Sequence, residues 1–171
     1  LEGPSLRTHL QDHLPQFPEI AALLGAELSR ALSVAHGQGI IHRDVKPENV
    51  LIRRGGTVAL CDFGIARVLD KETMTSTGQL LGSPAYMAPE HIKGLPVDAR
   101  CDLFALGVLM YEAVAGQLPF QGKNPHDMLV RIAAGAHEPI AALQPIIGSE
   151  LSTTIEQCLA NDPADRPTDA S

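Results

Sequence analysis

Asn49 and Asp62 are the residues whose types and spacing point most directly to chemistry. They flank a predicted β-hairpin whose strands, residues 50–53 and 58–61, are short and rich in apolar residues. The glycine pair 55–56 suits a two-residue turn, and such a turn places Asn49 directly opposite Asp62. Because Mg²⁺ prefers carboxylate and amide oxygens as ligands, the sequence predicts a metal clamp at the end of this hairpin.

The residues around the hairpin match a known catalytic pattern almost letter for letter. They read His42-Arg43-Asp44-Val45-Lys46-Pro47-Glu48-Asn49 before the first strand and Asp62-Phe63-Gly64 after the second. On these residues the chain resembles the eukaryotic-type (Hanks-type) serine/threonine protein kinases. Within that family, its sequence resembles the bacterial members.

The resemblance implies a role for each polar residue of the pattern. Asp44 would accept the proton of the substrate hydroxyl, and Lys46 would pair with the γ-phosphate of ATP. Asn49 and Asp62 would hold Mg²⁺, or Mn²⁺ as an alternative, against the nucleotide phosphates. Catalytic residues are therefore expected at Asp44, Lys46 and Asn49.

The same resemblance places a nucleotide beside the start of the chain. Leu1 would contribute a backbone contact to the adenine, and Ser5 would lie near the ribose. The full set of expected nucleotide-binding residues is Leu1, Ser5, Lys46, Glu48, Asn49, Leu51 and Asp62.

Residues 62–90 resemble an activation segment that ends at Ala88-Pro89-Glu90. Its middle is rich in hydroxyl groups, and the candidate regulatory phosphosites are Thr75, Ser76 and Thr77. A phosphate there would pair with Arg43 and order the segment. A polar loop whose threonines and serines serve only solubility is the alternative.

The end of this segment, residues 82–90, resembles the peptide-docking stretch of serine/threonine kinases. Most relatives have threonine where this chain has Ser83, so the hydroxyl is kept. Glu90 is expected to pair with Arg166, which lies in a stretch similar to the family's D-P-x-x-R-P motif. Asp102 is expected to bind the catalytic-loop backbone near His42 and Arg43, although a plain helix N-cap is also open.

Apolar residues at helical spacing predict most of the remaining elements. Helices are expected over residues 7–13, 18–36, 102–115, 124–135 and 149–160. In the second of these, the core-facing residues are expected to be Ile20, Leu23, Leu24, Leu28, Leu32 and Ala35. Ile40-Ile41 reads as a very short buried strand. The expected fold class is α+β and mainly α-helical: a kinase-like large lobe with one small hairpin.

Composition narrows the class of protein. The 171 residues carry a net charge of −7, which argues against a nucleic-acid surface. Three widely spaced cysteines indicate neither a disulfide framework nor a zinc site, and they fit a cytoplasmic setting. The most apolar run, residues 103–120, is interrupted by Glu112 and so falls short of the roughly 18 uninterrupted apolar residues expected of a membrane span, and no membrane contact is expected.

The resemblance covers essentially all residues but only part of a kinase. Residues 1–6 match the end of the hinge, 7–53 the first helices and catalytic loop, and 91–171 the helical remainder. No G-x-G-x-x-G loop or V-A-I-K-type lysine precedes the catalytic loop, so the ATP-covering N-terminal lobe is expected elsewhere in a parent chain. The expected function is phosphorylation of protein Ser/Thr residues by that parent, with this segment inactive alone. A non-catalytic docking or scaffold module is the alternative.

Overall fold

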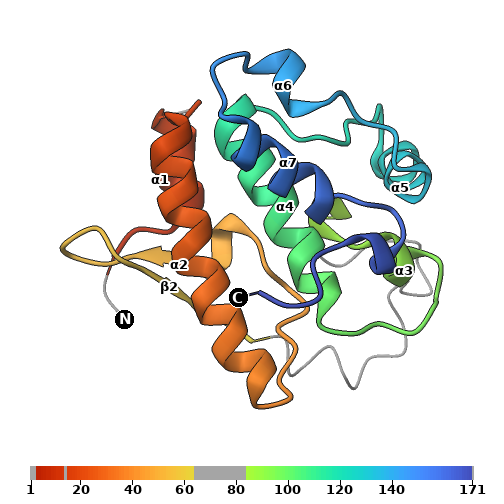
Figure 1. Ribbon diagram of the computed structural model, residues 1–171, viewed down its shortest axis with the longest axis horizontal. Helices are drawn as coiled ribbons and strands as arrows, with labels where there is room; N and C mark the ends of the chain where they lie inside the picture. Colours follow the sequence, from red (N-terminus) through yellow and green to blue (C-terminus); the bar gives the residue numbers. More distant parts are fainter. Residues whose placement is uncertain (1–2, 14, 64–83, 171) are drawn as a thin grey trace.

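The computed structural model of the chain describes residues 3–13, 15–63 and 84–170. Its α-helices are α1 (Leu6–His13), α2 (Pro18–Gly37), α3 (Pro89–Ile92), α4 (Arg100–Ala115), α5 (Pro125–Ala134), α6 (Ile140–Leu143) and α7 (Ser149–Cys158). The strands are β1 (Val50–Ile52) and β2 (Val58–Leu60), and the 3₁₀ turns are η1 (Pro47–Asn49), η3 (Pro84–Tyr86) and η4 (Pro163–Asp165). Figure 1 shows α4 in the middle of the molecule, between α2 and α7, with the hairpin beyond α2.

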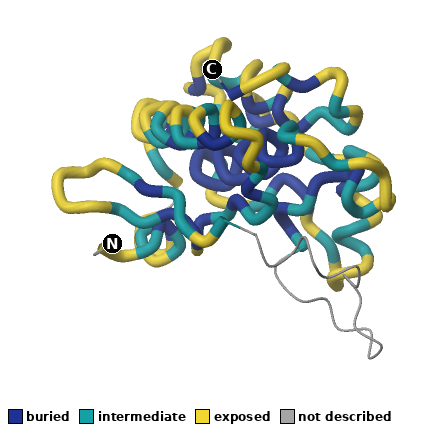
Figure 2. Tube along the Cα trace, turned by 90° about the horizontal axis from the view of Figure 1, so that it is seen from below, coloured by how far each residue is buried: buried dark blue, intermediate teal, exposed yellow. Residues whose placement is uncertain are grey.

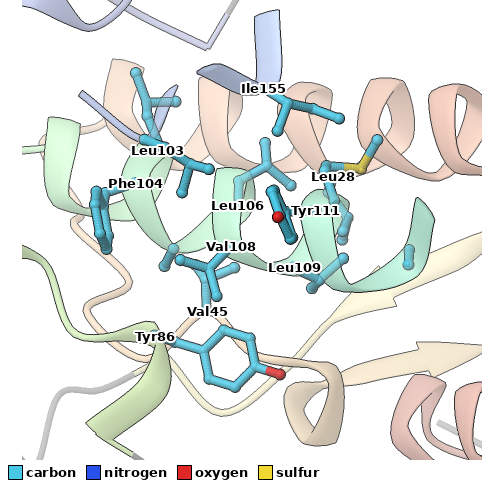
Figure 3. Close-up of a cluster of buried hydrophobic side chains, with 14 of the residues drawn as sticks. Leu28, Val45, Tyr86, Leu103, Phe104, Leu106, Val108, Leu109, Tyr111 and Ile155 are labelled. Atoms are coloured by element: carbon cyan, nitrogen blue, oxygen red, sulfur yellow. The ribbon is translucent and has the colours of Figure 1, made fainter. Parts of the chain in front are cut away.

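Helix α4 is the centre of the hydrophobic core. Every residue from Cys101 to Val114 is buried, as expected for a helix that is apolar on all sides. Its two main packing partners are α2 and α7. In Figure 3, Tyr86 and Val45 lie on one side of α4, while Leu103 and Ile155 lie on the other. Figure 2 shows the resulting buried centre under an exposed rim.

Helix α2 confirms the predicted helix, but only part of its predicted buried face. Leu28 and Leu32 are fully buried against the core, whereas Ile20 is 50% and Leu23 is 68% exposed. The buried stripe continues through Ala21 instead. Ile20 and Leu23 lie on the flank of that stripe, where they line an open hollow shared with α1 and the hairpin.

The hairpin is present, but its predicted register is wrong by one residue. Val50 pairs with Leu60, and Arg53 N donates to Thr57 O at 2.8 Å, so the loop has three residues. Gly55 and Gly56 both have positive φ, 98° and 86°, within this longer loop. Since three-residue loops also favour glycine at such positions, Gly-Gly did not distinguish the two loop lengths.

The other four predicted helices, α1, α4, α5 and α7, agree with their predicted positions to within two residues, whereas the short helices α3 and α6 were not predicted. Asn124 caps α5 by accepting a hydrogen bond from Asp127 N at 2.9 Å, and α7 begins at Ser149 as predicted. The predicted strand at Ile40-Ile41 is wrong: these residues form no strand, and Ile40 is exposed. Two successive isoleucines therefore mark only a connecting segment between α2 and the catalytic loop.

Candidate active site

The catalytic loop brings Asp44, Lys46 and Asn49 into direct contact. Lys46 Nζ lies 2.8 Å from Asp44 Oδ2. The Asn49 side-chain amide donates to the Asp44 backbone carbonyl at 2.8 Å and to Asp44 Oδ2 at 2.9 Å. The 3₁₀ turn η1 makes this approach possible, because it folds Asn49 back toward the start of the loop. A carboxylate is thus held between a cation and an amide.

The hydrogen bonds of Asn49 also set the direction of its amide oxygen. Both donor contacts go to Asp44, so Oδ1 accepts no hydrogen bond within the described part of the chain. Asn49 O accepts from Cys61 N at 2.8 Å, so Cys61 is the residue opposite Asn49. Asp62 therefore lies one residue further along the chain and not opposite Asn49, as the two-residue turn had predicted. The Asp62 side chain is exposed. An available amide oxygen beside an exposed carboxylate fits a hard cation whose remaining ligands are phosphate oxygens or water.

His42 joins the catalytic loop to the end of β2. Its ring is fully buried, its Nδ1 accepts from Asp44 N at 3.2 Å, and its Nε2 donates to Cys61 O at 3.0 Å. The ring also lies 4.5 Å, centroid to centroid, from Phe63. Burial lowers the pKa of His42 below its ordinary value. The imidazole is therefore a neutral bridge that positions Asp44 and the residue before Asp62.

Asp102 fixes the backbone at the start of the catalytic loop. Its carboxylate accepts from His42 N at 2.8 Å, from Arg43 N at 2.7 Å and from His36 Nε2 at 2.8 Å. The expected contact is therefore present, but the N-cap reading of Asp102 is wrong, because Ala99 occupies the N-cap of α4. His36 was not singled out from the sequence, since 66 residues separate it from Asp102.

Two residues of the site adopt a backbone conformation that non-glycine residues rarely use. Arg43 has φ of 64° and Asp62 has φ of 58°. Left-handed residues of this kind concentrate at functional sites, where surrounding contacts hold them in place. The Asp102 carboxylate supplies that contact at Arg43. Arg43 Nε is buried and has no hydrogen-bond partner within the described residues.

The structure brings together two of the residues expected near the nucleotide. Ser5 forms an isolated bridge with Leu51, and Ser5 Oγ accepts from Thr8 N at 3.3 Å at the start of α1. Glu48 is exposed and accepts from Arg7 Nε at 2.9 Å. Six further residues predicted from the sequence lie outside the described part of the chain: Leu1, Gly64, Thr75, Ser76, Thr77 and Ser83.

Glu90 and Arg166 form a buried, two-pronged ion pair. Arg166 Nη1 and Nη2 lie 2.8 and 2.7 Å from the two Glu90 carboxylate oxygens. The guanidinium also donates to Arg100 O at 3.0 Å and sits 5.0 Å from the centroid of the Phe104 ring. This contact ties the residues after η3 to the C-terminal turn.

A second buried polar cluster was not predicted from the sequence. Arg7 on α1 donates to Glu112 Oε1 at 2.7 Å and to the Tyr86 hydroxyl at 2.5 Å, and Tyr86 donates to Glu112 Oε2. The three residues come from α1, η3 and α4, and 105 residues separate Arg7 from Glu112. No local pattern marks such a contact. An arginine within a short polar helix reads simply as a surface residue.

The helical body and its loop-bearing hairpin define the large lobe of a protein kinase, and comparisons with known proteins agree. The family model described as "Protein kinase domain" matches residues 1–171. The chain is 40% identical to the serine/threonine-protein kinase PkaA and 38% identical to PkaB, both of Streptomyces coelicolor. It is also 38% identical to the serine/threonine-protein kinase pkn2 of Myxococcus xanthus.

The chain belongs to the protein kinase family, and these relatives are bacterial serine/threonine kinases. The alignments cover 98, 97 and 99% of the chain but only 31, 41 and 21% of PkaA, PkaB and pkn2. The chain therefore spans between about a fifth and two-fifths of each relative. Within the described residues, no helix combines the length and apolar character needed to cross a bilayer.

Proposed function

We propose that the protein containing this chain transfers the γ-phosphate of ATP to serine or threonine hydroxyls of other proteins. The observation that carries the proposal is the contact of Asp44 with both Lys46 and Asn49, at 2.8 and 2.9 Å. Phosphoryl transfer requires positioning and charge neutralisation more than covalent chemistry. A carboxylate, a cation and two oxygen ligands within one loop-and-hairpin unit meet that requirement.

Each residue has a defined part in the proposed reaction. Asp44 accepts the proton of the attacking hydroxyl, and Lys46 neutralises charge on the transferred phosphoryl group. Asn49 and Asp62 hold Mg²⁺, which when bound neutralises the phosphate oxygens of ATP. Asp102 and His42 keep the loop in its strained, catalytic shape through the contacts described above.

The proposed nucleotide site includes residues near the N-terminus. The proposed regulation acts through phosphorylation of the activation segment. Ser5, Glu48 and Leu51 contribute to binding ATP, with Leu1 at the edge of the adenine. A phosphate on Thr75, Ser76 or Thr77 pairs with Arg43, whose Nε lacks a partner within the described residues. The use of ATP and the three free thiols of Cys61, Cys101 and Cys158 support a cytoplasmic site of action.

We further propose that residues 1–171 supply the large lobe and have little or no activity alone. A kinase catalytic domain needs a glycine-rich loop and a strand lysine that cover the phosphates. Neither motif occurs in these 171 residues. The short share of each relative that the chain covers supports a parent protein with further segments.

A phosphotransfer assay tests both parts of the proposal. The full-length natural protein and the 171-residue chain are each incubated with Mg²⁺, γ-labelled ATP and a positional-scanning library of serine and threonine peptides. We expect transfer by the full-length protein and none above background by the chain. Mass spectrometry of the labelled full-length protein should place autophosphorylation on at least one of Thr75, Ser76 and Thr77.

Two substitutions in the full-length protein serve as controls. Asp62→Ala and Asp44→Asn should each abolish transfer, because one removes a metal ligand and the other the base. A full-length wild-type protein that binds Mg²⁺-ATP but transfers nothing would reject the kinase proposal in favour of a docking module. Transfer by the 171-residue chain that Asp62→Ala abolishes would show that the chain is active alone.

A further inference from the structure

We propose that the open hollow between α1, the first turns of α2 and the hairpin is a docking surface for an acidic, apolar segment of a partner protein. None of the residues that carry the proposed reaction lines this docking hollow, so the inference does not depend on phosphotransfer. Figure 1 shows the hairpin loop projecting on the side of the molecule that carries α1 and α2. The apolar lining of the docking hollow includes Leu6, Phe17, Ile20, Leu23, Ile52 and Val58.

Large apolar side chains are unusually exposed at the docking hollow. Phe17 is 74% exposed, and Ile20 and Leu23 are exposed as well. Within the described part of the chain, these are three of the eight exposed large apolar side chains, and all three fall within residues 17–23. Single exposed apolar residues are ordinary on a protein surface, whereas a contiguous group of them marks an interaction site.

The shape of the docking hollow suits several apolar side chains at once. Its volume is about 690 Å³, within the range of pockets that enclose a ligand. Leu6 is buried and Ile52 and Val58 are partly buried, so they form the deeper lining. Phe17 and Leu23 form the exposed rim. An occupant with two or more large apolar residues would therefore bury both the floor and the rim.

Charge at the hairpin loop indicates which polar residues the partner carries. Arg53 and Arg54 are exposed, and neither guanidinium has a hydrogen-bond or ion-pair partner among the described residues. They line a smaller hollow that shares Ile52 with the docking hollow. Of the described residues that line the docking hollow, Glu27 is the one carboxylate, and it is paired with Arg30 at 2.6 Å. This cationic edge complements aspartate or glutamate side chains.

A protein segment fits these features better than a membrane surface does. Surfaces that bind anionic membranes combine projecting apolar side chains with several basic residues. The docking hollow is concave instead, and two arginines lie at its edge. The net charge of −7 on the whole chain also opposes approach to anionic lipid. We therefore assign the docking hollow to a peptide segment that places large apolar residues next to aspartate or glutamate.

A peptide selection tests the chemistry of the occupant. A phage library of random peptides is selected on the immobilised full-length natural protein, after phage that bind the Phe17→Asp variant have been removed. Aspartate suits this position because Phe17 is the N-cap of α2. We expect the enriched peptides to combine large apolar residues with adjacent aspartate or glutamate. Enrichment of apolar basic peptides, or no enrichment, would reject the inference.

The variant Leu23→Asp tests where the enriched peptide binds. Measured by fluorescence anisotropy with the labelled peptide, its Kd should rise at least about tenfold, because the contact with one leucine is lost. Val34→Asp is the matched control, since Val34 lies on the same helix, is 65% exposed against 68% for Leu23, and does not line the docking hollow. Both variants should unfold near the wild-type temperature. Equal Kd values in the two variants would show that the peptide binds elsewhere.

A second pair of variants tests the cationic edge. Arg53→Ala/Arg54→Ala and Lys123→Glu each lower the net charge by two, but the exposed Lys123 does not line the docking hollow. At low ionic strength the arginine variant should bind the peptide about fivefold more weakly than the wild type, and added salt should affect it less. Lys123→Glu should keep the wild-type Kd. Equal weakening in both variants would remove the argument from charge complementarity and overturn the inference.

Two further measurements compare the other possible occupants. We expect no co-sedimentation of the full-length protein with vesicles of phosphatidylcholine and phosphatidylglycerol that depends on Leu23. We also expect no dimer in sedimentation velocity that Leu23→Asp dissociates. Either result would assign the docking hollow to a membrane or to a second copy and would overturn the inference. Because every readout is binding, failure of the phosphotransfer assay alone would leave the docking surface standing.

Discussion

At the scale of single residues, the catalytic loop depends on two buried groups that have no reaction chemistry of their own. Asp102 accepts two backbone amides of the loop, and His42 links the Asp44 amide to the Cys61 carbonyl. Both contacts act on the backbone beside a strained residue, Arg43. Without them, Arg43 would relax toward a commoner conformation and shift Asp44. These contacts of the chain itself therefore hold the loop in place.

The neutral state of His42 leads to a prediction about pH. Because burial lowers the pKa of His42 in the folded protein below the unfolded value of 6.5, the unfolded state binds the proton first as the pH falls. The stabilisation is fully present above about pH 6.5 and is lost as the pH falls through the folded pKa. We expect the free energy of urea unfolding to drop more steeply with acidification in the wild type than in His42→Gln. Identical pH slopes for the two proteins would contradict this assignment.

At the scale of elements, the close packing of α4 on α7 depends on Gly107. A Cβ at this position would lie 2.7 Å from Cys158 Cβ and 3.3 Å from the Cys158 backbone carbon. Neither atom can move without shifting a helix, so Gly107→Ala should destabilise the chain by about 1–3 kcal/mol. The expected gain in helix propensity of up to about 1 kcal/mol does not offset this. Urea unfolding of the purified chain measures the difference.

Gly25 on α2 offers a matched control for that prediction. A Cβ there would meet the side chain of Met110, with the Sδ and Cε atoms closest at 2.9 and 2.8 Å. A methionine end group can take another rotamer, so Gly25→Ala should be neutral or stabilising by up to about 1 kcal/mol. If both alanine variants unfold at the same urea concentration, the close approach at Gly107 has no energetic consequence.

The elements also show how far the sequence predicts the fold. Helices such as α2 and α7 were predictable because periodicity, proline and glycine are local signals. The hairpin was predictable as an element but not in register, since Gly55-Gly56 fits a two- or a three-residue loop. Ile20 and Leu23 continue the apolar period of α2, yet which face is covered depends on neighbouring elements that no local pattern describes.

The same distinction applies to the candidate site. Asp44, Lys46 and Asn49 could be selected as candidates because a known pattern holds them within one loop, and the structure brings them into contact. The contacts that position them join distant segments: His36 with Asp102 and Arg7 with Glu112. Such pairs have no fixed spacing. Only a three-dimensional arrangement identifies them.

At the scale of the whole molecule, α4 collects the contacts that hold the other segments around the site. Asp102 near its first turn binds the catalytic loop, and Glu112 near its last turn binds α1 and the turn η3. The carbonyl of Arg100 accepts from Arg166 near the C-terminal end. Segments from both ends of the sequence are thus attached to one buried helix, as the central position of α4 in Figure 1 illustrates.

The ion pair of Glu90 with Arg166 closes this arrangement and should contribute strongly to stability. The Arg166 side chain is 0% and that of Glu90 is 4% exposed. Arg166→Met would leave a buried carboxylate without its cation, so we expect a loss of about 3–5 kcal/mol in the free energy of urea unfolding. Arg30→Met breaks the Glu27–Arg30 pair, whose side chains are 40% and 75% exposed, and should lose no more than about 1 kcal/mol. Equal losses in the two variants would mean that the buried pair does not hold the C-terminal turn to α3, and that α4 alone sets their relative position.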